Sequence, residues 1–260
     1  PVPKTYSLCM DENILGTPFY IMECVRGLIF WDSRLLEENI TTRGKVFDSM
    51  NQSIAKLHQV DFKKLELADF GRPGNYVERQ LKRWGRQYLE ADYERIPEMD
   101  LLIEWLEDRI PEQIQTSIVH GDYRLDNMIF DENKHQVLAI LDWELSTLGD
   151  PLADFAYHVM QWRVPFELHR GLEGADLKSL GIPDEKNYLE SYCQRTGRVE
   201  VKDWDFYLIF SLFKMSAICY GILVRIDHGT AASDHAMKTG SLAKPFAKLA
   251  WSQVLQANLD

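Results

Sequence analysis

The alternation of apolar and polar positions divides the chain into a short β segment, a helical stretch, a second β segment and a long helical remainder. The first β segment has two runs, Thr5–Met10 and Thr17–Val25, that are rich in β-branched, aromatic and aliphatic residues. Between them lie the polar residues 11–13 and Gly16, which are typical of a turn. We therefore predict an N-terminal β-hairpin that ends at residues 26–27.

Helical spacing replaces alternation after residue 40, where Thr41 or Thr42 is a suitable N-cap for a first helix. Asn75 and Glu78 form a capping-box pattern at the start of a second helix. A third helix is expected from about Met99 until Pro111. The apolar faces of the first two helices are predicted to consist of Val46, Met50, Ile54, Leu57, Val77, Leu81, Trp84 and Tyr88.

The centre of the chain contains three short apolar runs that predict strands, at Ser117–Val119, Met128–Phe130 and Val137–Leu141. From residue 150 onward the pattern is helical, with Asp150 as N-cap and Pro151 in the first turn. The later helices are expected near Asp184–Arg195, Asp203–Ile226 and His235–Gln256, the last kinked or split by Pro245.

Composition narrows the class of protein. A chain of 260 residues with 45% hydrophobic residues can bury a sizeable core. Its net charge of −11 repels nucleic-acid phosphates and anionic lipids, so we expect neither nucleic acid nor a membrane as a partner. The four cysteines have neither zinc-site nor disulfide-scaffold spacing, and the N-terminus does not resemble a signal peptide, so we expect a cytoplasmic location.

One apolar stretch, Phe206–Val224, is long enough to span a membrane. Lys214 lies near its middle, where an ammonium is costly in lipid. We therefore predict a buried helix.

The residues with the clearest chemical meaning are in the octapeptide His-Gly-Asp-Tyr-Arg-Leu-Asp-Asn at His120–Asn127, followed by Asp142. Phosphoryl transfer needs a group that orients a hydroxyl and removes its proton, and hard oxygen ligands that hold magnesium against phosphates. Asp122 follows a predicted strand, Asn127 leads into the next, and Asp142 ends the one after that. Strand ends can bring these three side chains to one rim, and the spacing matches a protein-kinase catalytic loop followed by a metal-binding Asp.

Two departures from the protein-kinase pattern are informative: Gly121 stands in place of Arg, and Asp-Trp-Glu at 142–144 in place of Asp-Phe-Gly. With Gly149-Asp150-Pro151 and Asp154, this pattern resembles the aminoglycoside phosphotransferase and choline kinase superfamily. The run Ile140–Phe155 resembles the branch with kinase-like domains fused to acyl-CoA dehydrogenases. The resemblance extends over essentially the whole chain.

The resemblance implies a role for each matching position. Asp122 would be the catalytic base, and Asn127 and Asp142 would hold Mg²⁺ against the phosphates of ATP. His120 would support the loop from beneath, and Asp154 would bond to the loop backbone.

The same resemblance implies a hinge at Met22–Val25 that touches adenine through backbone groups of Glu23 and Val25. In this superfamily a phosphate-covering loop and a strand lysine precede the hinge. Here only about twenty residues do so, and Lys4 lies in a Pro-flanked start rather than in such a strand.

We therefore expect an α+β, protein-kinase-like two-lobed fold with most of the N-terminal β lobe missing from this chain. Residues 1–27 would be a remnant of that lobe and the hinge, and residues 28–260 a mainly helical catalytic lobe.

The implied function is transfer of the γ-phosphate of ATP, with Mg²⁺, to an alcohol group of a small molecule, either aminoglycoside-like or of hydroxyacyl type. The second type would suit fusion or association with an acyl-CoA-processing enzyme. The alternatives are a non-catalytic pseudokinase-like binding module and, third, metal-assisted phosphoester hydrolysis.

Lys214 bears on the charge of the acceptor. It either lies at the helix edge with its ammonium in water or faces the catalytic cleft as a candidate ligand for an anionic acceptor.

Overall fold

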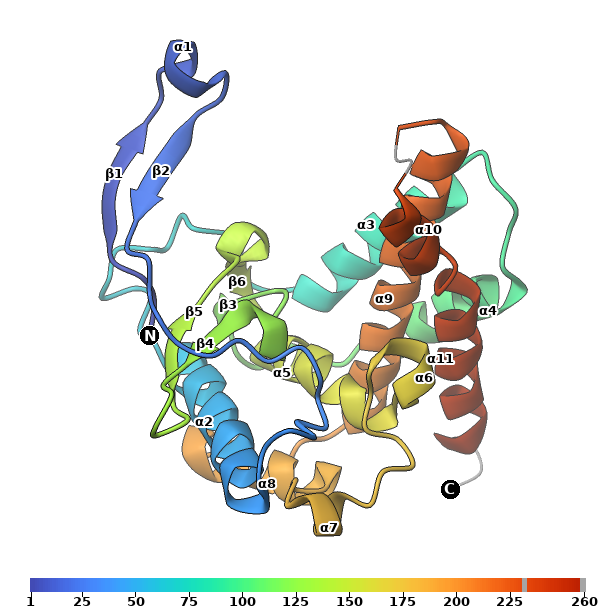
Figure 1. Cartoon of the computed structure of the whole chain (residues 1–260). Helices are drawn as coiled ribbons and strands as arrows, with labels where there is room; N and C mark the ends of the chain where they lie inside the picture. The colour runs from blue at the N-terminus through green and yellow to red at the C-terminus, as the bar shows by residue number, and fades with distance from the viewer. Residues whose placement is uncertain (231–232, 258–260) are drawn as a thin grey trace.

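The computed structural model describes residues 1–230 and 233–257. The chain begins with a predicted feature, an antiparallel hairpin of β1 (Thr5–Cys9) and β2 (Phe19–Met22). Its turn contains a short helix, α1 (Glu12–Leu15), which Asp11 caps by accepting a hydrogen bond from the Asn13 amide. The hairpin extends away from the rest of the molecule (Figure 1), and most of its side chains are exposed.

Helices make up most of the remaining chain, and their order follows the sequence pattern. The helices of the first half are α2 (Ile40–His58), α3 (Tyr76–Leu89) and α4 (Pro97–Glu107). Those of the second half are α5 (Pro151–Val159), α6 (Phe166–His169), α7 (Leu177–Leu180), α8 (Glu185–Thr196), α9 (Trp204–Asp227), α10 (Asp234–Gly240) and α11 (Ala243–Ala257).

Two small antiparallel ladders lie between the two helical groups. The strands β4 (Met128–Phe130) and β5 (Val137–Ile140) pair with each other, and β3 (Ser117–Val119) pairs with β6 (Thr147–Gly149). The first three central strands were predicted from sequence, but β6 was not. A backbone bridge joins Leu28 to Phe130, so the segment after the hairpin is fixed to the edge of β4.

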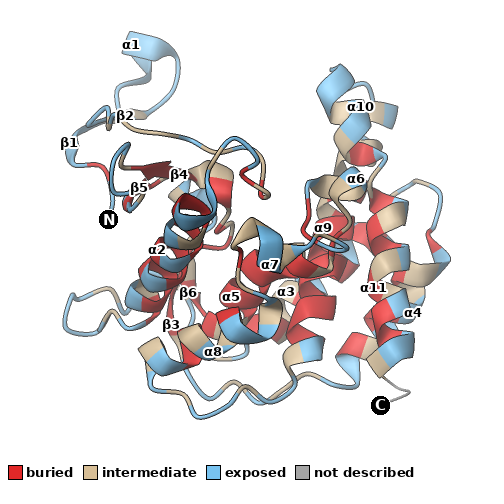
Figure 2. Ribbon diagram, turned by 60° about the horizontal axis from the view of Figure 1, so that its bottom comes forward, coloured by how far each residue is buried: buried red, intermediate tan, exposed pale blue. Residues whose placement is uncertain are grey.

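Helix α9 forms the centre of the C-terminal part and packs against α3, α5, α10 and α11. Figure 2 shows buried residues concentrated on α9 and on the helices around it. By length and composition α9 is a candidate membrane span, but 72% of its apolar window is buried within the structure. This burial agrees with the prediction of a core helix over Phe206–Val224.

Two local expectations, both about helix caps, were wrong. Asn39, rather than a threonine, caps α2 by accepting from the Thr42 amide. Asn75 adopts a left-handed conformation and makes no side-chain cap, and Gln113 accepts the hydrogen bond of the Tyr76 amide at the start of α3. The expected split of the last helix is confirmed: α10 and α11 meet at residues 241–242, and Pro245 lies in the first turn of α11.

Candidate functional site

The predicted catalytic loop connects β3 to β4 and ends in a 3₁₀ turn at Leu125–Asn127. Asp122 is partly buried within it, and both oxygens of its carboxylate are engaged. Oδ2 accepts a hydrogen bond from the Asn127 side-chain amide at 3.0 Å, and Oδ1 lies 3.2 Å from Nε of Arg124. The loop thus fixes the direction of the Asp122 carboxylate before any substrate binds.

Asn127 and Asp142 lie at the same end of the β4–β5 ladder. The Asn127 carbonyl accepts a hydrogen bond of 2.8 Å from the amide of Leu141, the residue before Asp142. Asp142 then leaves the strand in a left-handed conformation, with φ of +65°, and its side chain is exposed. Its carboxylate and Oδ1 of Asn127 accept no hydrogen bond from the residues that the structure describes, so both can accept a ligand.

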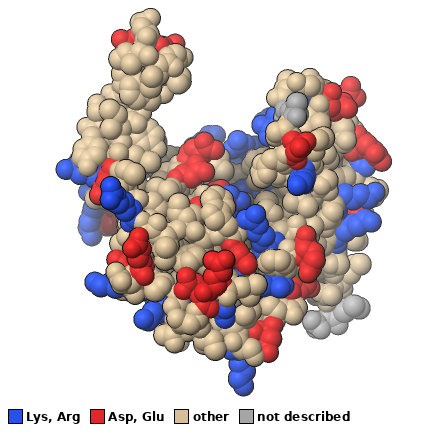
Figure 3. Space-filling view, in the orientation of Figure 1, with Lys and Arg blue, Asp and Glu red and all other residues tan. Residues whose placement is uncertain are grey.

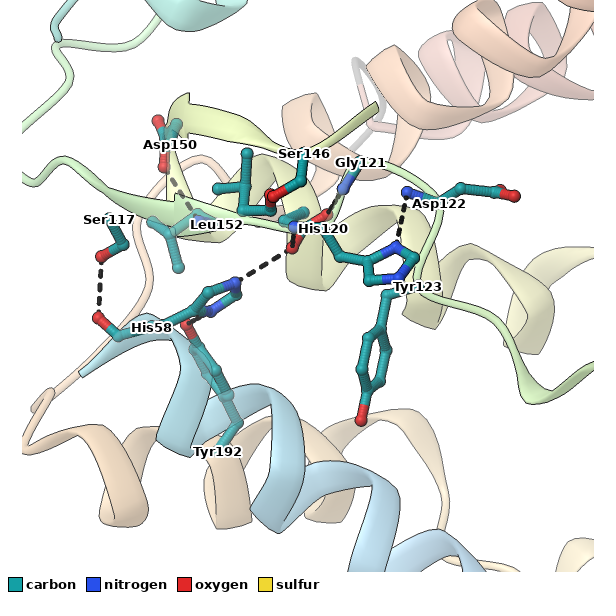
Figure 4. A network of polar contacts seen from close by, with 12 residues as sticks. His58, Ser117, His120, Gly121, Asp122, Tyr123, Ser146, Asp150, Leu152 and Tyr192 are labelled. Atoms are coloured by element: carbon teal, nitrogen blue, oxygen red, sulfur yellow. Dashed lines mark hydrogen bonds and ion pairs between the residues drawn. The ribbon is translucent and has the colours of Figure 1, made fainter. Parts of the chain in front are cut away.

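Asp154 of α5 holds the start of the loop from below. Its two oxygens accept hydrogen bonds of 2.8 Å from the backbone amides of His120 and Gly121. Oδ2 also lies 3.1 Å from Nε2 of His58, whose Nδ1 contacts the Tyr192 hydroxyl at 2.7 Å. Figure 4 shows the Asp122 side chain pointing away from this buried network.

The charge state of Asp154 follows from these contacts. Burial raises the pKa of its carboxyl, but the hydrogen bond and charge of His58 and the amide of His120 oppose burial, and the net effect is a lowered pKa. A buried carboxylate with three donors is satisfied as an anion.

His120 lies beneath the loop, as the resemblance implied for a supporting residue. Its Nδ1 accepts from the Asp122 amide at 3.2 Å, and Nε2 lies 2.9 Å from the Leu141 carbonyl, so that Nε2 is the donor. The ring packs against Trp143, with centroids 4.8 Å apart. His120 therefore links the loop of Asp122 to the strand that leads into Asp142.

The sequence prediction assigned no role to Arg124. Its guanidinium lies between two carboxylates, with Nε 3.2 Å from Asp122 and Nη2 3.2 Å from Asp126. Burial lowers the pKa of Arg124, but the charge of Asp122, helped by Tyr157, Asp126 and Asp142, outweighs burial and raises it. A permanent cation two residues after the candidate base was the sequence signal that could have identified it.

Lys214 is buried on α9, so the alternative with its ammonium in water is wrong. Its Nζ donates a 2.7 Å hydrogen bond to the carbonyl of Gly121 and lies 4.3 Å from the centroid of the Tyr157 ring. Burial lowers the pKa of Lys214 to about 8, against the raising effect of Asp154 and Asp122. An acceptor-binding role for Lys214 stays a prediction.

The candidate hinge follows the hairpin. The Glu23 amide donates to the Lys4 carbonyl at 2.8 Å. Within the described chain, the Glu23 carbonyl and the Val25 amide make no hydrogen bond, so one acceptor and one donor remain for an adenine edge. The assignment of both residues to a nucleotide site stays a prediction.

A half-open groove of about 360 Å³ lies between α3 and α9. Arg83 and Gln87 line it from α3, and Gly221 and Arg225 from α9, with apolar walls that include Trp84, Ile218 and Val224. Neither arginine forms an ion pair with a described carboxylate. Figure 3 shows basic side chains at the floor of the hollow between the hairpin and α10, on the side where α3 lies.

Comparison with known proteins identifies the family. Residues 1–203 match the model of the phosphotransferase enzyme family. Acyl-CoA dehydrogenase family member 10 of Mus musculus is 43% identical over 253 residues, which cover 96% of this chain and 24% of that protein. Across the first three curated relatives, this chain spans 24–33% of their length.

Solved structures agree with this result. A candidate aminoglycoside phosphotransferase from Ralstonia eutropha JMP134 is 47% identical with a TM-score of 0.94, over 98% of this chain and 78% of that chain. Aminoglycoside phosphotransferase APH(3″)-Id from Streptomyces rimosus, solved with ADP and streptomycin, shares the fold at 16% identity and a TM-score of 0.55, over 82% of this chain and 75% of that chain. The expected resemblance and kinase-like fold are confirmed: the chain belongs to the phosphotransferase enzyme family.

Proposed function

We propose that this protein transfers the γ-phosphate of ATP, with Mg²⁺, to a hydroxyl group of a small molecule. The observation that carries the proposal is the arrangement of Asp122, whose carboxylate is fixed by Arg124 and Asn127 beside the strand end that presents Asp142. Positioning and charge stabilisation supply most of the catalysis in phosphoryl transfer, and this loop provides both.

In this proposal Asp122 orients the acceptor hydroxyl and takes its proton. The hydrogen bond from Asn127 and the ion pair with Arg124 restrict the rotation of the carboxylate, so that one lone pair faces the acceptor. Arg124 also adds a positive charge beside the position of the transferred group, where negative charge is spread over the phosphoryl oxygens. Transfer is direct and needs no covalent enzyme intermediate.

The residues present fit a magnesium ion that binds together with a nucleotide. Mg²⁺ is commonly held by one or two protein oxygens while phosphates and waters complete its octahedron. Oδ1 of Asn127 and the Asp142 carboxylate are two such oxygens, both at the same end of the β4–β5 ladder. The described residues include no cluster of three or more His, Cys, Asp and Glu side chains, which a self-contained metal cage would need. When bound, Mg²⁺ would neutralise charge on the phosphates.

We propose an acceptor of hydroxyacyl type rather than an aminoglycoside, with the α3–α9 groove as its binding site. The α3–α9 groove combines apolar walls with two arginines that lack carboxylate partners, which favours an anionic molecule with an apolar chain. A polycationic aminoglycoside would instead require carboxylates. The match to a relative named for acyl-CoA dehydrogenases supports the same class, and with it association with an acyl-CoA-processing enzyme.

Full-length protein with MgATP, incubated with a hydroxy fatty acid, its coenzyme A thioester or an aminoglycoside, tests the proposal. We expect ADP release and a phosphorylated product with the hydroxyacyl compounds. Asp122→Asn should bind MgATP like the wild type but lose most turnover, whereas Asp142→Asn should also weaken MgATP binding. Nucleotide binding without turnover in the wild type would instead identify a non-catalytic binding module.

A further inference from the structure

Lys214 is a buried cation that the proposed reaction does not use. Its side chain is inside the core, yet none of the described carboxylates lies within ion-pair distance. The hydrogen bond from its ammonium goes to a backbone carbonyl, that of Gly121, at 2.7 Å. A buried ammonium is costly, and its pKa of about 8 reflects that cost. The position therefore calls for a role that an apolar residue could not fill.

The peptide group that Lys214 contacts is the one that joins Gly121 to Asp122. Lys214 donates to the oxygen of this peptide group. The N–H of the same peptide group, which is the amide of Asp122, donates to Nδ1 of His120 at 3.2 Å. The preceding N–H, of Gly121, donates to Asp154 at 2.8 Å. Consecutive peptide groups at the catalytic loop are thus held by side chains from α5, α9 and the loop itself.

The backbone at this point has a conformation that glycine adopts freely and other residues rarely do. Gly121 has φ of +84°, and a Cβ there would lie 2.7 Å from the Leu145 carbonyl oxygen. The Gly121 carbonyl points inward to the buried ammonium of Lys214 on α9. A buried carbonyl without a donor is unfavourable, and a charged donor is stronger than a neutral one.

We propose that Lys214 is a positioning residue. From α9 it holds the Gly121–Asp122 peptide group and thereby fixes the direction of the Asp122 side chain. The inference rests on the proposed function of Asp122 and adds a residue on α9 to the machinery. It differs from the role of an acceptor ligand, because the ammonium already has a backbone partner and lies over the Tyr157 ring.

Steady-state kinetics in the full-length protein separate the two roles. Lys214→Met removes the donor but keeps a similar volume, so kcat should fall roughly tenfold to a hundredfold, as expected for a displaced catalytic group. The KM values for MgATP and for the acceptor should change by less than about twofold. Lys214→Arg, which keeps a charged donor, should recover part of kcat, and Lys202→Met, at an exposed lysine, should be neutral. A higher acceptor KM with unchanged kcat would overturn the proposal.

Amide hydrogen exchange gives a readout that does not depend on turnover. In Lys214→Met the amide of Asp122 should exchange at least about tenfold faster, while amides of α2 and α11 keep their rates. Lys214→Gln, with a neutral donor, allows the same measurement if the Met variant does not fold. Equal acceleration throughout the chain, or none at Asp122, would contradict the proposal. If the wild type phosphorylates no hydroxyl compound, the proposed function fails, and the exchange rate at Asp122 still decides whether Lys214 holds the loop.

Discussion

The side-chain amide of Asn127 donates hydrogen bonds of 3.0 Å to both the carbonyl and the carboxylate of Asp122. One residue therefore positions the candidate base with its nitrogen and, in the proposed function, would offer its oxygen to the metal. This double use explains why Asn is suited to the position and Asp is not. A carboxylate can bind Mg²⁺, but it cannot donate to another carboxylate.

Substitutions at Asn127 should separate these two uses. Asn127→Asp keeps a metal ligand and places a second negative charge about 3 Å from Asp122, so MgATP should still bind while turnover falls at least about a hundredfold. Asn127→Ala should lose both MgATP affinity and turnover. Titration calorimetry with MgATP and an ADP-release assay measure the two effects, and equal MgATP affinities in the two variants would contradict the metal assignment.

Arg124 should matter for turnover more than for stability. Arg124→Gln removes the charge beside Asp122 and the phosphoryl group, so kcat should fall by about two orders of magnitude. Because the side chain is only 27% exposed and lies between two carboxylates, we expect the free energy of unfolding to fall as well, by about 1–2 kcal/mol, which is less than the effect on turnover. Arg124→Lys keeps the charge and should be intermediate. A variant with normal turnover would remove Arg124 from the mechanism.

Asp154→Asn tests the buried support of the loop. The pKa of Asp154 is lowered in the fold, so its contribution to stability is present above about pH 4 and is lost as the pH falls through the folded value. At pH 7 the free energy of unfolding of the variant should be lower than that of the wild type by about 3 kcal/mol or more, because the Asn NH₂ would face the donors of His58, His120 or Gly121.

The difference between wild type and Asp154→Asn should shrink below about pH 4, as measured by urea unfolding. Asp61→Asn, at an exposed aspartate paired with Lys64, is the control and should change stability little. A loss that stays constant from pH 7 to pH 3 would show that the charge of Asp154 is not what stabilises the loop.

His158 should contribute acid sensitivity in a higher pH range. Burial lowers its pKa from 6.5 to about 4, although Asp154 and a Tyr123 hydrogen bond act in the opposite direction. The unfolded chain binds the proton below about pH 6.5 but the folded chain only near pH 4, so stability is complete above pH 6.5 and decreases by about 3 kcal/mol as the pH falls to 4.

His158→Gln can keep the hydrogen bond to Tyr188 and should lose less stability than the wild type between pH 6.5 and pH 4. Urea unfolding midpoints between pH 6.5 and pH 4 measure this loss of stability. His228→Gln, at an exposed position, is the control and should follow the wild type. Parallel pH profiles of wild type and His158→Gln would rule out His158 as the titrating group.

The parts of the fold that sequence could predict are those set by local pattern. The runs at 117–119, 128–130 and 137–141 form strands because apolar β-branched residues are bounded by polar turns. The strand Thr147–Gly149 was missed because Thr-Leu-Gly is not an apolar run, and its pairing with β3 is not visible in the local pattern. Local pattern likewise suggested the Asn75 cap, but Asn75 has a left-handed backbone and makes no side-chain cap, and the distant Gln113 accepts from the Tyr76 amide.

The candidate site likewise combines features that local sequence predicts with features that depend on distant contacts. The spacing of Asp122, Asn127 and Asp142 pointed to one rim, and the contacts of the loop with β5 bring them to the same end of a ladder. The pairing of His58 with Asp154, 96 residues apart, depends on how α2 and α5 both pack against β3, and no spacing encodes it. The contact of Lys214 with Gly121 was beyond sequence reasoning for the same reason.

Two glycines with similar backbones provide the last prediction. Gly121 and Gly74 have φ of +84° and +74°, so alanine at either position costs about 1 kcal/mol of backbone strain. A Cβ at Gly74 meets nothing within 4 Å, whereas at Gly121 it would lie 2.7 Å from the Leu145 carbonyl oxygen, a backbone atom that cannot rotate away. Gly74→Ala should therefore show only the strain and normal turnover. Gly121→Ala should lose further stability and shift Asp122, so that kcat falls by much more than the folded fraction does. Urea unfolding and ADP release on both variants measure this, and equal behaviour of the two would mean that the catalytic loop tolerates displacement at Gly121.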